Sequence, residues 1–166
     1  NDKWFQGTAD AVRQSMHHLI NQDFDYILIL SGDQLYQMNF EEMANFHISQ
    51  NADLTIATIP VNAQDAQGFG IMKVDSDKSI PRFVEKPSAE ILDDWRSEVN
   101  ERSKDQQKYF LASMGIYIFS KKALNDLFDE NPNAVDFGKE IIPSAIDSGR
   151  KIVSFEYDGY WTDIGN

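Results

Sequence analysis

Short apolar runs that alternate with stretches of helical periodicity are the feature that most constrains the fold. Residues 26–30, Tyr-Ile-Leu-Ile-Leu, form the clearest run, and an uninterrupted run of this kind is typical of a central strand buried on both faces of a parallel sheet. Further strands are predicted at residues 54–59, 70–74, 80–85, 111–119 and 152–155, and helices at residues 9–20, 40–49, 88–102, 121–128 and 137–147. This alternation predicts an α/β fold with a mostly parallel sheet flanked by helices.

Three local signals refine this prediction. Residues 70–74 and 80–85 flank a polar turn and are expected to form a hairpin, which makes the sheet mixed, with Pro81 favouring an edge position. Gly115 lies inside a predicted strand and indicates a bulge or a close backbone approach. Thr8 is a suitable N-cap for the helix that follows it.

Composition limits the possible partners. The 166 residues suit one domain, and the formal net charge of -12 makes nucleic-acid binding improbable. The same charge repels a nucleotide, so a nucleotide site would need a divalent cation and one or two placed lysines or arginines. Cysteine is absent, and the histidines (His17, His18 and His47) lack zinc-site spacing and are expected on the surface or in the core. No apolar run of about 20 residues and no signal peptide is present, and a cytoplasmic location is expected.

Three charged residues stand where ligands can bind. Asp33 follows an apolar strand and Gly32, at the edge where open α/β sheets bind ligands, but an aspartate there equally suits a turn cap. Asp163 lies among aromatic residues and glycines, and Lys86 ends a strand before a proline. Taken alone, these last two positions favour a structural turn and an exposed lysine over a metal ligand and a phosphate clamp.

Seven short blocks together resemble one enzyme family. The chain is similar, in order, to blocks of the bacterial glucose-1-phosphate adenylyltransferase (ADP-glucose pyrophosphorylase) family. The similarity covers nearly the whole chain except residues 88–108. The blocks are Trp-Phe-Gln-Gly-Thr-Ala-Asp-Ala-Val from residue 4, Ser-Gly-Asp from 31, Phe-Gly-Ile-Met from 69, Phe-Val-Glu-Lys-Pro from 83, Ala-Ser-Met-Gly-Ile-Tyr from 112, Asp-Phe-Gly-Lys-Glu-Ile-Ile-Pro from 136 and Tyr-Trp-Thr-Asp-Ile-Gly from 160.

The resemblance implies a Rossmann-like nucleotide-diphospho-sugar transferase fold that makes ADP-glucose and pyrophosphate from ATP and glucose 1-phosphate, for glycogen-type glucan synthesis. By resemblance, Asp33 and Asp163 would hold Mg²⁺ and Lys86 would bind the sugar phosphate. The other implied contacts are Glu85 and Ser113 to the glucose, Asp136 and Trp161 around the sugar pocket, Gly7 and Thr8 along the nucleotide, and Gly70 beside the sugar. Catalysis would then rest on Asp33, Lys86 and Asp163.

The resemblance also implies a longer protein. The family's glycine-rich phosphate loop is expected before Asn1 and its left-handed β-helix domain after Asn166, so residues 1–166 correspond to part of a catalytic domain. We expect the full-length protein to be a homo-oligomer that binds neither nucleic acid nor membrane, and the 166-residue chain alone to be inactive. Phe5 stands where the family often has tyrosine, which removes a hydroxyl group.

Three rival interpretations stay open at this point. The chain could belong to another sugar-1-phosphate nucleotidyltransferase that uses UTP, dTTP or GTP, or to a non-catalytic regulatory paralogue. The blocks around Gly7, Ser113 and Asp136 favour the adenylyl enzyme, and the presence of Asp33, Lys86 and Asp163 favours an active parent. A coincidental set of motifs in an unrelated α/β domain is the third and weakest interpretation.

Overall fold

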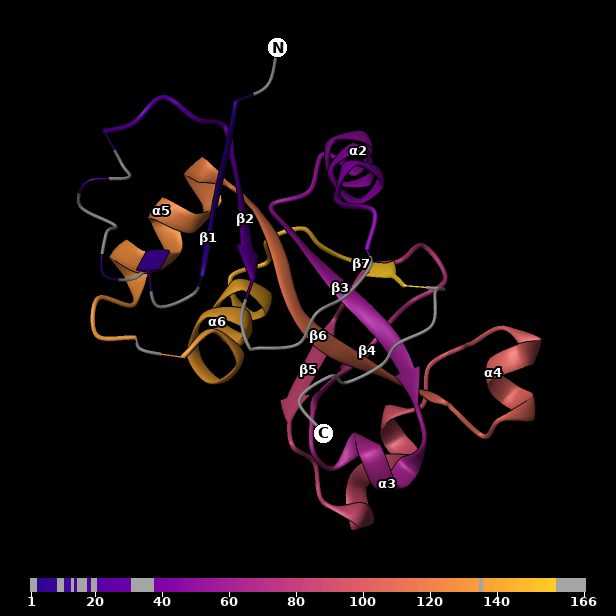
Figure 1. The fold of residues 1–166 in the computed structure, drawn as a ribbon. Coiled ribbons are helices and arrows are strands. Elements are labelled where there is room, and N and C mark those ends of the chain that lie inside the picture. Colours follow the sequence, from indigo (N-terminus) through magenta and orange to yellow (C-terminus); the bar gives the residue numbers. More distant parts are fainter. Residues whose placement is uncertain are drawn as a thin grey trace.

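The computed structural model describes residues 3–8, 11–12, 14, 18, 21–30, 38–134 and 136–157. The described strands form one seven-stranded sheet in the order β1-β2-β6-β3-β7, with β4 joined to β6 and β5 joined to β4 (Figure 1). The strands are β1 (Trp4–Thr8), β2 (Tyr26–Leu30), β3 (Leu54–Val61), β4 (Gly70–Lys73), β5 (Arg82–Glu85), β6 (Phe110–Ser120) and β7 (Ile152–Glu156). The helices are α2 (Phe40–Gln50), α3 (Ala63–Ala66), the 3₁₀ helix η1 (Ala89–Trp95), α4 (Glu101–Asp105), α5 (Lys121–Glu130), the π-helix η2 (Phe137–Ile141) and α6 (Ile142–Asp147).

The sheet is mixed, as the sequence predicts. β1 pairs with β2 and β3 with β7 in parallel, whereas β6 runs antiparallel to β2, β3 and β4. Strands β1, β2, β3, β4 and β7 therefore share one direction, and β6 and β5 run the other way. β2 is thus flanked by one parallel and one antiparallel neighbour, and not by parallel strands on both sides as expected for residues 26–30.

Strand β6 holds the sheet together because three strands share it. β3 runs along one side of β6, and β2 and β4 pair in succession along the other side, at Ile116–Ser120 and at Leu111–Ala112. Between these two stretches the β3 register shifts, so that two steps along β3 match four along β6. Gly115 lies in this bulge with a φ of 74°, a conformation that favours glycine. Of the two features predicted at Gly115, a bulge or a close backbone approach, the structure shows the bulge.

Each face of the sheet is covered by its own apolar cluster. On β2, Ile27 and Ile29 join a cluster with α5, η2 and α6, and Leu28 joins a second cluster with α2, α3 and η1. Strand β6 divides its residues between the two clusters in the same alternating way. Its bulge adds an even number of residues, so the alternation continues past it. Within the described ranges, every helix is too short or too polar to span a lipid bilayer.

Most predicted elements are present, with two differences. Residues 4–8 form strand β1, which pairs with β2 and was not predicted as a strand. The helix predicted over residues 88–102 is wrong: η1 ends at Trp95, and Arg96 is extended, with φ -65° and ψ 137°. Contacts to the β4–β5 hairpin explain this, because the Lys73 ammonium group donates to the Arg96 carbonyl at 2.5 Å and the Ser97 hydroxyl group donates to the Met72 carbonyl at 3.3 Å. The predicted hairpin itself is confirmed, and β5 is its edge strand.

Candidate active site

The candidate site lies where the ladder along β6 is interrupted between β2 and β4. The last residue of β2, Leu30, faces Ile116, and Ile71 of β4 faces Ala112. Ser113 therefore lies at the end of the β4–β6 ladder together with Gly70, the first residue of β4. The Ser113 hydroxyl oxygen accepts a hydrogen bond from the Gly115 N–H at 3.2 Å, which fixes this side chain within the bulge. Sheet edges of this kind are common places for ligands in α/β proteins.

Glu85 ends β5 directly beside Gly70, its partner in the hairpin register. Its carboxylate lies between two glycines: a Cβ built on Gly70 would be 3.5 Å from Glu85 Oε2, and one on Gly138 would be only 2.4 Å away. A Cβ on Gly70 would also lie 2.5 Å from the ring of Phe83. The absence of side chains at these two positions therefore leaves room for the carboxylate and the ring.

Asp136, the residue before η2, lies near the Glu85 carboxylate. It caps η2, because its Oδ1 accepts from the Lys139 N–H at 2.8 Å, and Glu140 Oε1 in return accepts from the Asp136 N–H at 3.1 Å. This reciprocal arrangement resembles a capping box. The next residue, Phe137, is buried against Tyr117, Phe119 and Phe128. The aromatic contacts anchor η2 and so fix Asp136 near Glu85.

The environment of Glu85 disfavours its negative charge. Partial burial raises the pKa of the Glu85 carboxyl above its ordinary value, and the nearby Asp136 carboxylate raises it further. Lys86 and Lys139 act in the opposite direction through their positive charges. No described residue donates a hydrogen bond to the Glu85 carboxylate. A half-buried acceptor of this kind is stabilised when a ligand supplies hydroxyl or N–H donors.

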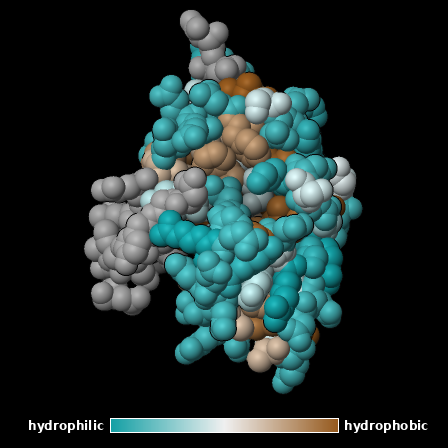
Figure 2. All heavy atoms as spheres, turned by 90° about the vertical axis from the view of Figure 1, so that its right-hand side faces the viewer, coloured by the Kyte–Doolittle hydropathy of each residue, from teal (hydrophilic) through white to brown (hydrophobic). Residues whose placement is uncertain are grey.

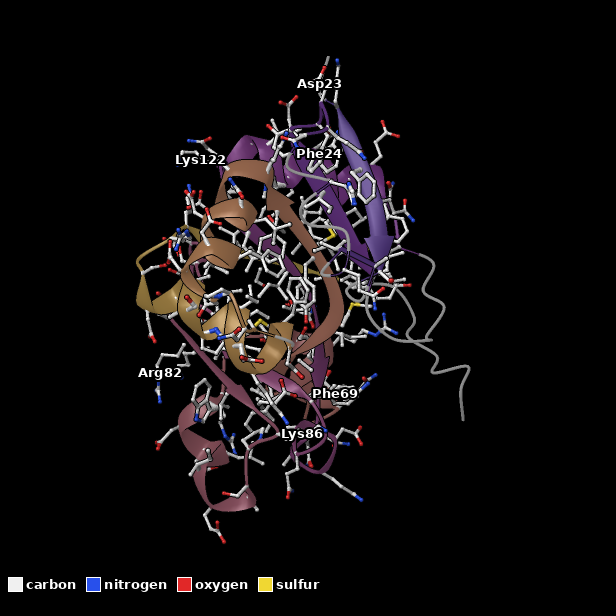
Figure 3. The ribbon with its side chains drawn as sticks, turned by 90° about the vertical axis from the view of Figure 1, so that its left-hand side faces the viewer. Asp23, Phe24, Phe69, Arg82, Lys86 and Lys122 are labelled. Carbon is white, nitrogen blue, oxygen red and sulfur yellow. The ribbon has the colours of Figure 1, made fainter. Side chains whose placement is uncertain are left out.

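Lys86 follows Glu85 in an uncommon backbone conformation. Its φ of 46° lies in the left-handed region, and its N–H donates to the Phe69 carbonyl at 2.9 Å. Figure 3 shows Lys86 and Phe69 next to each other at the end of the molecule that holds the hairpin. The side chain of Lys86 is exposed, and no described carboxylate forms an ion pair with it. Within the described residues, its ammonium group is thus exposed and suited to contact an anion.

Gly7 and Thr8 lie at the carboxyl end of β1, in register with the end of β2. Gly7 faces Ile29 and Thr8 faces Leu30, so both residues lie beside the end of β2, where its pairing with β6 stops at Ile116. The Thr8 hydroxyl oxygen accepts from the Ala11 N–H at 3.1 Å, which confirms the predicted N-cap contact. The helix predicted over residues 9–20 lies largely outside the described residues.

Three of the predicted site residues, Asp33, Trp161 and Asp163, lie outside the described residues. The prediction that the two aspartates share one cation therefore stays a prediction. Among the residues that the structure describes, no three acidic or histidine side chains are grouped closely enough to hold a metal ion. Glu85 and Asp136 are two carboxylates that lie near each other, but Lys86 and Lys139 also act on Glu85. Ammonium groups repel a cation, so this pair does not suit a metal site.

The structure describes seven of the predicted site residues: five lie around the start of β4, and Gly7 and Thr8 lie beside the end of β2. It adds two residues that were not predicted. Gly70 and Glu85 lie at the ends of their strands and Lys86 follows Glu85, whereas Ser113 lies within β6 and Asp136 caps η2. Gly138 and Lys139 are the additions: Gly138 lies against the Glu85 carboxylate, and the charge of Lys139 acts on it. Both belong to the Asp-Phe-Gly-Lys block, so the block itself was the signal, although only its aspartate was assigned.

A separate apolar hollow of about 570 Å³ lies between α2 and the strands β1, β2 and β6. Trp4, Phe40 and Ile48 are among its lining residues, and none of the predicted site residues lines it. Figure 2 shows one face of the molecule, on which hydrophobic surface gathers in the upper part and the lower part is mostly hydrophilic. The hollow is thus distinct from the polar site.

The fold and the site together define an α/β domain with a polar, lysine-bearing site beside its strand ends. A family model described as Nucleotidyl transferase matches residues 1–166. The chain therefore belongs to the nucleotidyl transferase family. Membership supports a transferase whose substrates are a nucleotide and a sugar phosphate, and the polar residues at the sheet edge are where such substrates are expected to meet the protein.

Proposed function

We propose that this chain belongs to a glucose-1-phosphate adenylyltransferase, which makes ADP-glucose and pyrophosphate from ATP and glucose 1-phosphate for glycogen-type glucan synthesis. The observation that carries the proposal is the pairing of Glu85 and Lys86 at the end of β5. One is a half-buried carboxylate without a described hydrogen-bond donor, and the other is an exposed ammonium group without a described carboxylate partner. A sugar phosphate supplies both missing partners, hydroxyl donors and an anion.

The sugar would lie over the hairpin end. Its hydroxyl groups would donate to Glu85 and meet the Ser113 hydroxyl group, and Gly70 would lie beside the sugar. Asp136 would contact the same ring from the η2 side, and Trp161 would complete the pocket. Hydrogen bonds to a charged group of this kind contribute about 1.5–3 kcal/mol each, so two or three suffice for selective binding of the sugar.

The chemistry requires positioning and not a protein nucleophile. A phosphate oxygen of glucose 1-phosphate attacks the α-phosphorus of ATP, a new oxygen–phosphorus bond forms, and the bond to the β-phosphate breaks in line to release pyrophosphate. Lys86 would hold the attacking phosphate and offset its charge, which matters in a chain of net charge -12. Gly7 and Thr8 would direct backbone N–H groups at the nucleotide.

Magnesium completes the proposal, with Asp33 and Asp163 as its ligands. The ion would neutralise charge on the nucleotide phosphates, a role that the described residues do not fill. The proposal also includes a homo-oligomeric full-length protein. The three sequence blocks around Gly7, Ser113 and Asp136 support the adenylyl reaction over its uridylyl and thymidylyl relatives.

Binding of glucose 1-phosphate, measured by isothermal titration calorimetry, tests the role of Lys86. We expect Lys86→Gln to weaken binding by about tenfold to hundredfold, since it removes one charge-assisted contact. Lys78→Gln is the matched control, because Lys78 is also exposed and also has a left-handed φ, of 76°. Equal affinities of Lys86→Gln and the unmodified chain would refute the assigned role.

Nucleotide selectivity is tested separately, with the full-length protein that contains this chain. We expect turnover of glucose 1-phosphate with ATP to exceed turnover with UTP, dTTP or GTP. A preference for one of these other nucleotides would reject the adenylyl assignment and keep the family. Absence of turnover with every nucleotide, at intact sugar-phosphate binding, would favour a regulatory paralogue.

A further inference from the structure

Gly138 lies against the Glu85 carboxylate, although the two positions are far apart in the chain. A Cβ at Gly138 would lie 2.4 Å from Glu85 Oε2 and 3.5 Å from Glu85 Cδ. Real Cβ atoms are not found this close to an oxygen, and ordinary contact begins at about 3.4 Å. Any side chain at Gly138 would therefore push the carboxylate away by about 1 Å.

The backbone around Gly138 cannot move easily to relieve this contact with Glu85. Gly138 follows Phe137, which is 7% exposed and packed among aromatic rings, and it lies within the turn closed by Asp136 and Glu140. The backbone of η2 is thus held by packing and by two hydrogen bonds. The Glu85 side chain, by contrast, is flexible and has no described hydrogen-bond donor. Steric pressure at Gly138 would therefore move Glu85 and leave η2 in place.

We propose that Gly138 is a positioning residue, whose missing side chain seats the Glu85 carboxylate at the sugar-binding edge beside Asp136. The inference rests on the proposed function in one respect, that Glu85 contacts the sugar. It goes further because the contact between Glu85 of β5 and the sugar then depends on Gly138 of η2. The flanking charges fit this geometry, because Asp136, Lys86 and Lys139 all act on the carboxylate in the position that Gly138 permits.

The first test is glucose 1-phosphate binding by Gly138→Ala. Gly138 has no left-handed φ, so alanine meets no backbone strain there, and Gly68→Ala is the matched control because a Cβ at Gly68 would meet only the Asp65 carbonyl, at 3.6 Å. We expect Gly138→Ala to weaken binding by about tenfold or more, since a displaced charged contact is lost. Gly68→Ala should bind like the unmodified chain. Unchanged affinity of Gly138→Ala would overturn the proposal.

The second test distinguishes positioning from general damage. Aspartate at position 85 is one methylene shorter, so its carboxylate does not reach the alanine methyl group. Adding Gly138→Ala to Glu85→Asp should then change the sugar-phosphate affinity by less than about twofold, although the same change in the unmodified chain is costly. Equal losses in the two backgrounds would show that alanine acts on the fold and not through Glu85.

The third test works without any substrate. Carbon-detected NMR of the Glu85 side-chain carboxyl, assigned by its loss in Glu85→Gln, reports its titration directly. Gly138→Ala should shift the pKa of Glu85, because the carboxylate moves relative to Asp136, Lys86 and Lys139, and Gly68→Ala should not. A shift without any sugar-phosphate binding would uphold the Gly138 contact and refute the proposed function. An unaltered titration would overturn the Gly138 proposal itself.

Discussion

His47 makes the fold sensitive to mild acid. Its imidazole is 1% exposed and lies 2.6 Å from the Thr55 hydroxyl through Nδ1 and 3.0 Å from the Ser120 hydroxyl through Nε2. The Ser120 hydroxyl group donates to the Ala52 carbonyl at 2.9 Å, so its oxygen accepts from His47 Nε2–H. Nδ1 then accepts from Thr55, which assigns one neutral tautomer. Of the two positions predicted for the histidines, surface or core, His47 thus takes the core position.

The size of the effect follows from the pKa. Burial lowers the pKa of His47 from 6.5 to about 4, with Asp53 acting weakly in the other direction. A lowered pKa means that the unfolded chain takes up the proton first, so stability is lost as the pH falls from about 6.5 toward 4. The linkage relation gives a loss of about 2 kcal/mol between pH 7 and pH 5. For a chain of this length, that corresponds to roughly 4–8 °C in Tm.

The substitution His47→Gln isolates the pH-dependent loss of stability that His47 causes. Glutamine keeps a hydrogen-bond donor and an acceptor but does not titrate. Urea unfolding followed by tryptophan fluorescence at pH 7 and pH 5 gives the free energies. We expect the unmodified chain to lose about 2 kcal/mol more than His47→Gln between the two pH values. The exposed His18 provides the control, because His18→Gln should behave like the unmodified chain. If the unmodified chain and His47→Gln decline in parallel, the assigned neutral state of His47 is wrong.

Further substitutions test other parts of the fold and the site. Phe137→Ala removes the ring that anchors η2 and should cost about 3–5 kcal/mol in urea unfolding; a cost near zero would contradict its buried position. Glu85 has a raised pKa, so the unmodified chain should lose stability as the pH rises through its titration, and Glu85→Gln should remove that dependence, with the exposed Glu90→Gln as control. Gly149→Ala places a side chain at a φ of 74° in open space and should cost about 1–2 kcal/mol from backbone strain alone, which thermal unfolding can measure.

Local sequence signals predict much of the sheet. The apolar run of β2, the polar turn of the β4–β5 hairpin and the glycine in β6 each carry a local physical cause, and the structure shows all three. Strand β1 was missed because Trp4–Thr8 contains a glycine and alternates between exposed and half-buried residues, so that only pairing with β2 makes it a strand. The wrong helix at residues 88–102 has the same origin, since distant contacts decide its conformation.

For the candidate site too, the sequence indicates some features and only the folded chain shows the others. The resemblance supplied Glu85, Lys86 and Asp136, but nothing local indicates that Gly138 touches Glu85, because that contact joins β5 to η2. The raised pKa of Glu85 likewise depends on neighbours that are distant in sequence. Motifs therefore identify which residues matter, whereas the relation between them comes from the folded chain.

The position of β6 in the chain has a consequence for synthesis on the ribosome. β2, β3 and β4 are all made before residues 110–120, the strand with which each of them pairs. A nascent chain that has not yet released Ser120 exposes several unsatisfied strand edges at once, and such edges invite misassembly with other chains. Chaperone binding to nascent chains should therefore fall sharply once β6 has left the exit tunnel.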